Sequence, residues 1–284
     1  MNGRASAPGA GTVLNALANG RGAAFAIDEE TTATVELDAA TTEVTGVVTD
    51  APEADTRLIE RCVSLTTDRY GDGEGGTVRT ASEVPMAAGL KSSSAAANAT
   101  VLATLDALGQ AEAVDPLEAC RIGVQAAREV GVTVTGAFDD ASASMLGGLT
   151  ITDNREDTLL ERATVDWDVL IWTPPERAYS ADADVKRCRR LAPVTDTVLS
   201  VAQQGNYGQA MTVNGLAFSA ALGFPTEPMF EALPEVAGVS LSGTGPSVHA
   251  VGDRDILEAV KKMWERREGT TWLTTTRITG AQTK

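Results

Sequence analysis

The chain has 284 residues, 43% of them hydrophobic and 22% charged, with 27 glycines. Single domains usually span roughly 100–200 residues, so we expect two domains or one large α/β domain. The composition excludes a disordered or collagen-like chain, and the absence of any run of about 18 apolar residues excludes a membrane-spanning helix. Residues 1–30 lack the basic start and long apolar block of a secretory signal, which predicts a cytoplasmic protein.

The charge balance is strongly acidic. Thirty-nine acidic residues against 23 basic ones give a net charge of −16, and only five of the basic residues are lysines. Such a surface repels nucleic acid and anionic membranes, so we expect neither as a partner. It is typical of proteins from salt-rich, halophilic cytoplasm, where salt screens the self-repulsion. The oligomeric state is left open.

Cysteine and histidine usage excludes several kinds of site. The three cysteines, Cys62, Cys120 and Cys188, are odd in number and widely spaced, so they form neither a disulfide framework nor a C-x-x-C metal site. The single histidine, His249, excludes a cluster of histidine ligands. Its strand-like surroundings favour a structural role over that of a catalytic base.

The chain opens with predicted strands at 31–37 and 43–49 and a helix at 53–70, from β-branched runs and helical spacing respectively. Residues 71–76 match G-x-G-x-x-G, but two acids in the segment would repel a pyrophosphate and a strand-like run at 77–84 follows. We therefore reject a dinucleotide site and expect a hairpin turn.

Two helices with clear end signals come next. An alanine-rich helix is predicted over 95–108 and ends at Gly109. The second begins at Asp115 as N-cap, with Pro116 at its first position and Glu118 completing a capping box.

The remainder of the chain mixes strands and helices in the α+β manner. A strand at 149–152 is followed by a polar stretch, which predicts a boundary between a domain at 1–153 and a second at 154–284. Further strands are predicted at 169–172, 236–241, 248–251 and 270–278, and further helices at 180–191, 195–204, 207–222, 227–233 and 253–266.

The glycine and serine loop before the alanine-rich helix is the strongest chemical feature. A helix start offers unpaired backbone N–H groups and the positive end of a dipole to an anion. The spacing of Gly89 and Lys91 does not fit a Walker A loop. The alternative is that Ser92, Ser93 or Ser94 simply caps the helix.

Three acidic residues are candidates for chemistry. Glu129 lies in the last turn of its predicted helix, where the dipole disfavours an acid, so it has either a partner or only solvent around it. Asp139 and Asp140 precede a short helical run, where one of them can cap the helix or accept a hydroxyl proton in phosphoryl transfer.

Two further glycine-containing segments, 7–11 and 242–247, are compatible with phosphate contacts or with tight turns. Together with the central loop they occur in a telling order: Ala-Pro-Gly at 7–9, Pro-x-x-x-Gly-Leu-x-Ser-Ser at 85–93, and Ser-Gly-Thr-Gly at 242–245. This order resembles the three motifs of the GHMP kinase superfamily. Within it, the residues at 86–98, the start at 3–8 and the Leu-Asn-Ala-Leu run at 14–17 are most similar to the archaeal-type shikimate kinases.

The resemblance implies a two-domain α+β fold, with an N-terminal nucleotide-binding domain and a C-terminal ferredoxin-like domain. It implies transfer of phosphate from ATP, with Mg²⁺, to the 3-hydroxyl of shikimate, on the route to chorismate and the aromatic amino acids. The acceptor cannot be derived from the phosphate machinery, so homoserine kinase or another small-alcohol kinase is the alternative. A non-catalytic nucleotide-binding regulator is disfavoured, because it needs no base.

The resemblance also implies roles for individual residues. Asp139 is the catalytic base by motif register, with Asp140 as the neighbouring alternative, and Ser93 and Glu129 are the Mg²⁺ ligands. The residues expected to hold the nucleotide phosphates are Pro85, Ala88, Gly89, Leu90, Lys91, Ser92, Ser93 and Ser94.

One position departs from the family pattern. Several relatives carry lysine after Ala-Pro-Gly, whereas this chain has Ala10, and we expect Lys91 to supply the missing cation. Shikimate carries a carboxylate, so its pocket should contain a cation as well. On charge alone we expect Arg177, Lys186 or Arg190.

Overall fold

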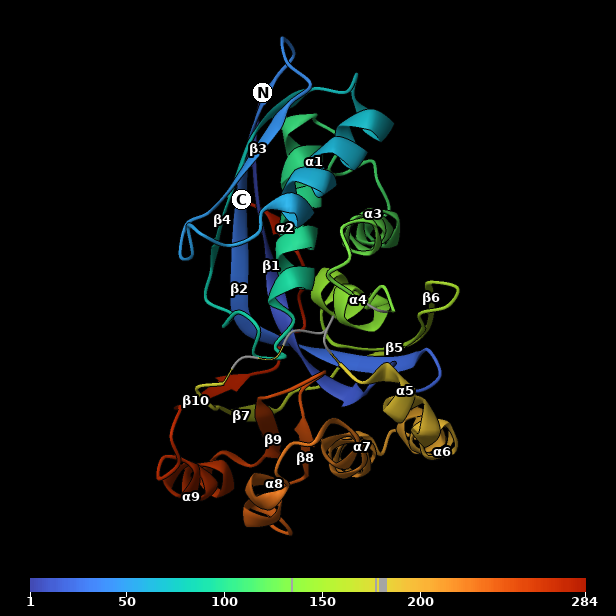
Figure 1. Ribbon diagram of the computed structural model, residues 1–284, viewed down its shortest axis with the longest axis vertical. Coiled ribbons are helices and arrows are strands. Elements are labelled where there is room, and N and C mark those ends of the chain that lie inside the picture. Colours follow the sequence, from blue (N-terminus) through green and yellow to red (C-terminus); the bar gives the residue numbers. More distant parts are fainter. Residues whose placement is uncertain (134, 177, 179–182) are drawn as a thin grey trace.

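The computed structural model describes residues 1–133, 135–176, 178 and 183–284. Two lobes lie one above the other along the long axis of the molecule, each built from a sheet and a set of helices (Figure 1). Arg177, one of the predicted acceptor contacts, lies outside the described residues.

Within the described residues, seven strands form the first sheet and four form the second. The first sheet contains β1 (Asn2–Leu14), β2 (Arg21–Asp38), β3 (Val44–Val48), β4 (Gly75–Ser82), β5 (Leu149–Asp153), β6 (Thr158–Ala163) and β11 (Gln282–Thr283). The second contains β7 (Asp168–Thr173), β8 (Gly238–Leu241), β9 (Val248–Gly252) and β10 (Thr270–Thr275).

Helices cover one face of each sheet. The first lobe has α1 (Arg57–Tyr70), α2 (Ser92–Ala107), α3 (Pro116–Glu129) and α4 (Phe138–Leu146). The second has α5 (Val185–Cys188), a 3₁₀ turn (Arg189–Leu191), α6 (Ala192–Gln203), α7 (Tyr207–Leu222), α8 (Glu227–Ala232) and α9 (Arg254–Trp264). The described helices include none long and apolar enough to cross a membrane.

The first sheet has the order β11-β1-β2-β4-β3, and β5 joins β2 to β6. Its described pairs are antiparallel except β3 with β4, which run parallel with α1 between them. Parallel neighbours need a crossover connection. The segment 71–76 therefore connects α1 to β4, and the predicted hairpin turn is wrong.

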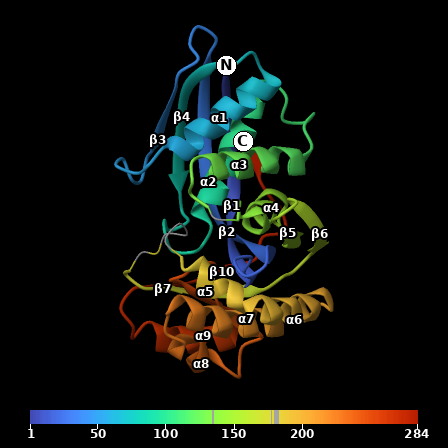
Figure 2. The ribbon, with the colours of Figure 1, turned by 45° about the vertical axis from the view of Figure 1, so that its right-hand side comes forward.

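The alanine-rich helix α2 lies at the centre of the first lobe, against β1 and β2 and in contact with α1, α3 and α4 (Figure 2). The backbones of α2 and β1 touch, because a Cβ atom on Gly3 would overlap with the carbonyl oxygen of Ala103. Ala95, Ala99 and Ala103 are fully buried. Small side chains in the helix thus allow a close approach that larger ones would prevent, and this fixes where the start of α2 lies.

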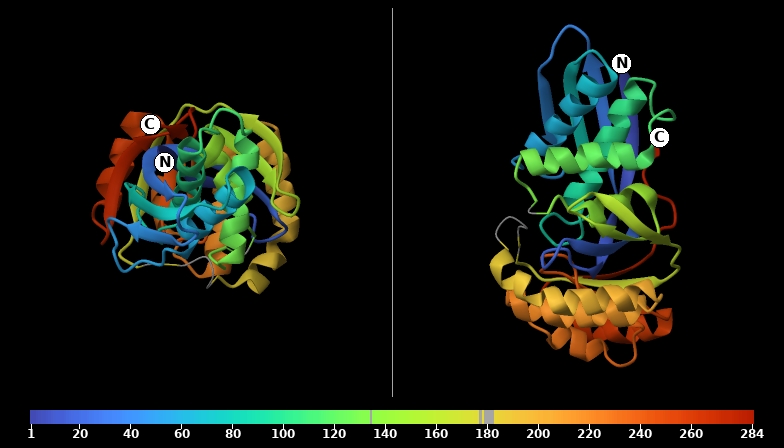
Figure 3. Two further views of the ribbon diagram at one scale, coloured as in Figure 1. Left: turned by 90° about the horizontal axis from the view of Figure 1, so that it is seen from above. Right: turned by 90° about the vertical axis from the view of Figure 1, so that its right-hand side faces the viewer.

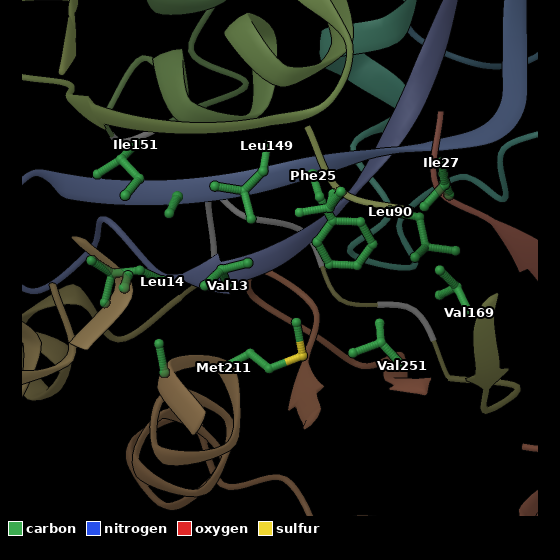
Figure 4. Packing of buried hydrophobic residues seen from close by; sticks show 14 of the residues in the cluster. Val13, Leu14, Phe25, Ile27, Leu90, Leu149, Ile151, Val169, Met211 and Val251 are labelled. Carbon is green, nitrogen blue, oxygen red and sulfur yellow. The ribbon is translucent and has the colours of Figure 1, made fainter. Parts of the chain in front are cut away.

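The second sheet is antiparallel, with the order β10-β7-β9-β8. In chain order these strands read 4-1-3-2, which confirms the predicted ferredoxin-like arrangement. Of its helices, α8 and α9 lie at the end of the molecule away from the first lobe (Figure 3), whereas α6 and α7 also contact β1 of the first lobe. The other face of the second sheet meets the first lobe through a shared hydrophobic core, where Phe25 and Ile27 of β2 approach Val169 of β7 and Val251 of β9 (Figure 4).

The division at residues 153 and 154 stays a prediction. The first sheet continues past this point, because β6 pairs with β5. The chain reaches the second sheet at β7 and returns to the first when β11 pairs with β1, where Ala5 faces Thr283. Two covalent connections therefore run between the sheets.

Glu30, at the middle of β2, ties this returning segment to the first sheet. Its carboxylate accepts hydrogen bonds from Ser6 Oγ (3.0 Å) and Arg277 Nη1 (2.8 Å), and it pairs with Lys284 Nζ. Burial alone would raise the pKa of Glu30, but these hydrogen bonds outweigh it and lower the pKa from 4.5 to about 2. The folded state therefore favours the ionised carboxylate.

We expect Glu30→Gln to lower the free energy of unfolding by about 1–2 kcal/mol near neutral pH, because the charge-assisted hydrogen bonds are lost. The difference from the native chain should persist above the ordinary pKa of 4.5 and disappear as the pH falls toward 2, where Glu30 becomes protonated. Urea unfolding across this range measures it, with the exposed Glu235→Gln as control. Equal stabilities of native and variant chains at neutral pH would contradict this role.

Candidate active site

The loop between β4 and α2 has an unusual backbone. Ala87, Gly89 and Lys91 have φ angles of 54°, 80° and 67°, in the left-handed region that residues other than glycine rarely adopt. Gly89 is required there, since a Cβ atom would overlap with the carbonyl oxygen of Ser242. For Ala87 and Lys91 this conformation costs about 1–3 kcal/mol each, and such strain is concentrated at functional sites.

The loop presents the open start of α2. Lys91 occupies the N-cap position, and no side chain caps the helix. Ser93 is exposed, Ser92 is partly exposed and Ser94 is buried. The first turn therefore offers its N–H groups and hydroxyls to a ligand, as an anion site requires. The alternative expectation that one of these serines caps the helix is wrong.

The other two glycine-containing segments contact this loop. Ser242 Oγ donates to the carbonyl oxygen of Gly89 at 2.8 Å, and Ser247 N donates to that of Ala88 at 3.3 Å. From β1, Ala10 N donates to the carbonyl oxygen of Leu90 at 3.2 Å. Three segments that are far apart in the sequence thus meet at one place.

Asp139 stands in the first turn of α4, and its side chain is 4% exposed. Asn154 Nδ2 donates to Asp139 Oδ1 at 2.6 Å, while the backbone N–H of Asp139 donates to Asn154 Oδ1 at 3.1 Å. A Cβ atom on Gly22 of β2 would overlap with Asp139 Oδ2. The carboxylate therefore fits between Asn154 and the backbone of β2.

Asp140 points to the loop between β4 and α2 instead. Its Oδ1 atom lies 3.1 Å from Lys91 Nζ, and the two side chains are 14% and 8% exposed. A Cβ atom on Gly243 would overlap with Lys91 Nζ, so the third segment covers the ion pair. The side chain of Ala10 is buried in a cluster with Ala24 and Ala143, so the position where several relatives carry lysine supplies no cation here.

Burial raises the pKa of both aspartates, and the charge of Asp140 raises that of Asp139 further. Lys91 opposes this shift for both carboxyls, and Asn154 does so for Asp139. A buried carboxylate with a raised pKa is a stronger proton acceptor than one in water, so this pair is suited to general base catalysis.

A cleft lies beside the aspartates, bounded by the end of β1, the loop before α4 and the turn after β8. It is lined by Thr12, Asn15, Ala16, Leu17, Lys91, Thr133, Thr135, Ala137, Asp139, Asp140, Gly243 and Thr244. The sequence assigned no role to Thr12, Thr133 or Thr135, because single threonines carry no spacing signal, whereas Thr244 belongs to the Ser-Gly-Thr-Gly motif. Asn15 had a weak signal as part of the Leu-Asn-Ala-Leu run.

Glu129 lies away from this cleft lining. At the last turn of α3, its Oε2 atom is 2.5 Å from Arg61 Nε, and Gln125 Nε2 donates to Oε1 at 2.8 Å. The hydrogen bond and charge of Arg61 lower the pKa of Glu129. The misplaced acid therefore has a partner on α1.

Two of the predicted acceptor cations belong to the described part of the chain, and neither lines the cleft. Lys186 and Arg190 are exposed and are absent from the cleft lining. Val185 and Cys188 of α5 pack in one cluster with Leu17, a residue of the cleft wall. The segment that carries Lys186 thus borders the cleft.

His249 is fully buried in β9, with its ring edge-on to Phe25 at 5.4 Å between centroids. Burial lowers its pKa to about 3, and the charge of Lys91 adds to this. It is neutral at physiological pH and does not line the cleft, in agreement with the structural role expected for it.

Comparison with known proteins defines the class. The model of the GHMP kinases N terminal domain matches residues 57–148. A homoserine kinase from Cytophaga hutchinsonii superposes with a TM-score of 0.77 at 16% identity, covering 100% of this chain and 97% of that one. The mevalonate kinase of Methanococcus jannaschii gives 0.78 at 14% identity, covering 99% of both chains. The fold is that of the GHMP kinases.

Sequence relatives define the particular family. The shikimate kinase of Halobacterium salinarum is 65% identical over 283 residues and covers 100% of both chains. That of Methanosarcina mazei is 54% identical, covering 93% of this chain and 90% of its own. The chain therefore belongs to the archaeal shikimate kinase family of the GHMP kinases. The resemblance and the fold class expected from the motifs are confirmed.

Proposed function

We propose that the protein transfers the γ-phosphoryl group of ATP to the 3-hydroxyl of shikimate, giving shikimate 3-phosphate and ADP. One observation carries the proposal: Lys91, the N-cap residue of α2, lines one cleft together with its buried partner Asp140. Identity of 65% over the full chain with a shikimate kinase supports shikimate as the acceptor.

The phosphates of ATP would lie at the start of α2. The N–H groups of the first turn and the hydroxyls of Ser92 and Ser93 supply hydrogen-bond donors, and the helix dipole adds a positive potential. The segments around the loop hold its strained conformation in place. Little reorganisation is then needed on binding.

The protein would supply only some of the ligands that Mg²⁺ needs at this site. The described residues contain no group of three His, Cys, Asp or Glu side chains that could hold a metal. This suits Mg²⁺, which keeps waters and is held largely by substrate phosphates. Bound there, it would neutralise charge on the transferred group. Ser93 and Glu129 are the proposed protein ligands, and Glu129 would exchange its contacts with Arg61 and Gln125 for the metal.

We expect Glu129→Gln to raise the Mg²⁺ concentration needed for half-maximal turnover by about tenfold, as loss of a supporting carboxylate does. Arg61→Gln provides the matched control, because it removes the partner of Glu129 but leaves the carboxylate. It should leave the Mg²⁺ requirement unchanged or lower it. Identical Mg²⁺ titrations of the native chain and Glu129→Gln would remove Glu129 from the metal site.

The two aspartates have different surroundings, and these bear on which is the base. The motif register predicts Asp139, whose oxygens contact Asn154 and the β2 backbone. Asp140 faces the loop that would hold ATP. We therefore propose Asp140 as the proton acceptor, with Lys91 keeping it ionised until the hydroxyl proton is transferred.

Recognition of the acceptor carboxylate stays a prediction. Lys186 and Arg190 are the proposed cations among the described residues, and Arg177, which lies outside them, is a third. Packing of α5, which carries Lys186, against Leu17 at the cleft wall supports Lys186, whereas Arg190 and Arg177 are proposed on charge alone.

An ADP-release assay with shikimate, homoserine and mevalonate tests the function. Turnover with shikimate alone is expected. Turnover with homoserine alone would identify homoserine, and not shikimate, as the acceptor. ATP binding without turnover on any acceptor would favour a nucleotide-binding regulator.

A further inference from the structure

Asn154 lies in the turn after β5 and is 2% exposed. Each of its polar atoms has a partner. Its backbone N–H donates to Gly20 O at 2.8 Å, and its carbonyl oxygen accepts from Arg128 Nη2 at 3.0 Å. Its Oδ1 accepts from Thr152 Oγ1 at 2.7 Å and from Asp139 N at 3.1 Å, while Nδ2 donates to Asp139 Oδ1 at 2.6 Å. Three separate parts of the first lobe, which carry Gly20, Arg128 and Asp139, therefore meet at this residue.

The start of α4 depends on this contact. The residue at its N-cap position is Ala137, which has a left-handed φ of 51° and no side chain able to cap a helix. Asn154 Oδ1 accepts an N–H of the first turn and so acts as the cap from a distant segment. Its Nδ2 fixes the Asp139 side chain at the same time.

The same turn determines where Asp140 points, because Asp140 is the next residue of α4. Asn154 forms hydrogen bonds with the backbone N–H and the carboxylate of Asp139. The carbonyl oxygen of Asp139 accepts from Ser142 Oγ at 3.1 Å and from Thr150 Oγ1 at 3.3 Å. The Asp140 carboxylate pairs with Lys91. The direction of its side chain therefore follows from how firmly its neighbour is held.

We infer that Asn154 is a positioning residue for the kinase reaction: by clamping Asp139 it fixes the first turn of α4 and holds the Asp140 carboxylate against Lys91. The inference rests on the proposed function only through the role of Asp140. Arg128 extends the clamp, since its guanidinium also donates to Thr135 O at 3.2 Å, in the wall of the cleft.

The hydrogen bonds of the Asn154 side chain can be removed without unfolding α4. Asn98 Nδ2 of α2 donates to Ala141 O at 2.8 Å and holds the helix from its other side. Asn154→Ala should therefore fold and free only the first turn. Asn154→Ser, whose hydroxyl still accepts a hydrogen bond, serves as a milder variant if the alanine variant is unstable. Val260→Ala, in the core of the second lobe, provides a control for general loss of stability.

The expected result is a fall in kcat of about tenfold or more for Asn154→Ala, with KM for ATP within about threefold of native, because the base but not the phosphate loop is displaced. In the double variant, Asn154→Ala should add little to the loss of kcat that Asp140→Asn causes alone. Val260→Ala should leave kcat per folded molecule unchanged. Native kcat in folded Asn154→Ala, or losses that multiply in the double variant, would overturn the inference.

A second measurement needs no turnover. The ¹³Cγ chemical shift of Asp140 can be titrated in the native chain and in Asn154→Ala. A looser pairing with Lys91 should raise the pKa of Asp140 in the variant, and an unchanged titration would overturn the inference. Absence of turnover by the native chain would count against the proposed function alone.

Discussion

Asp140→Asn is expected to lower kcat by about 10³-fold, while the Kd for ATP stays within about threefold of native. The asparagine keeps the size of the side chain but cannot accept the proton of the attacking hydroxyl. The phosphate contacts at the start of α2 are untouched by this change. Single-turnover kinetics and nucleotide titration measure the two quantities separately.

Asp139→Asn is the matched comparison. Its carboxylate lies between Asn154 and Gly22, so we expect a smaller loss of kcat that reflects a disturbed helix start. The reverse order, with Asp139→Asn much the more damaging, would place the base at Asp139 as the motif register predicts. Near-native turnover in both variants would exclude an aspartate base from this site.

Lys91→Gly is expected to reduce kcat by about 10²-fold and to move the acid limb of the pH profile of kcat to higher pH. Lys91 lowers the pKa of Asp140, so its removal raises that pKa and leaves less ionised base at a given pH. Glycine suits this backbone conformation, with its φ of 67°, so the loop should keep its shape. The loss then reports the missing charge.

The exposed Lys262→Gln serves as control for charge removal and should behave as the native chain does. A pH profile of Lys91→Gly that keeps its acid limb in place would contradict the pairing with Asp140. Unchanged kcat would show that the cation at this position is dispensable.

Signals confined to a few residues predicted local structure well. Asp115 caps α3 as expected, accepting from the N–H groups of Leu117 and Glu118. The expected capping box is not formed, because Glu118 pairs with Arg69 of α1 instead. Such a partner comes from tertiary packing, which no local pattern contains. Pairing of β3 with β4 is equally non-local, and because it is parallel, the segment 71–76 is a connection from α1 and not the predicted hairpin turn.

The site shows the same limit. The loop before α2 could be predicted as an open helix start, since its glycine and serines are close in the sequence, and its binding of phosphate stays a prediction. The choice between Asp139 and Asp140 could not, because adjacent residues of a helix point about 100° apart and only the packing of α4 orients them. Asn154 gave no signal at all: it lies in a polar stretch that predicted a boundary, and its partners come from distant parts of the chain.

The pairing of β11 with β1 bears on how the molecule acquires its shape. Ala5 and Ser6 are synthesised long before their partners Thr283 and Gln282. Until these partners are made, that strand edge remains open to pairing with other chains. Folding of the first lobe during translation is therefore incomplete until the second lobe has emerged from the ribosome. A truncated product that lacks β11 would be prone to aggregation.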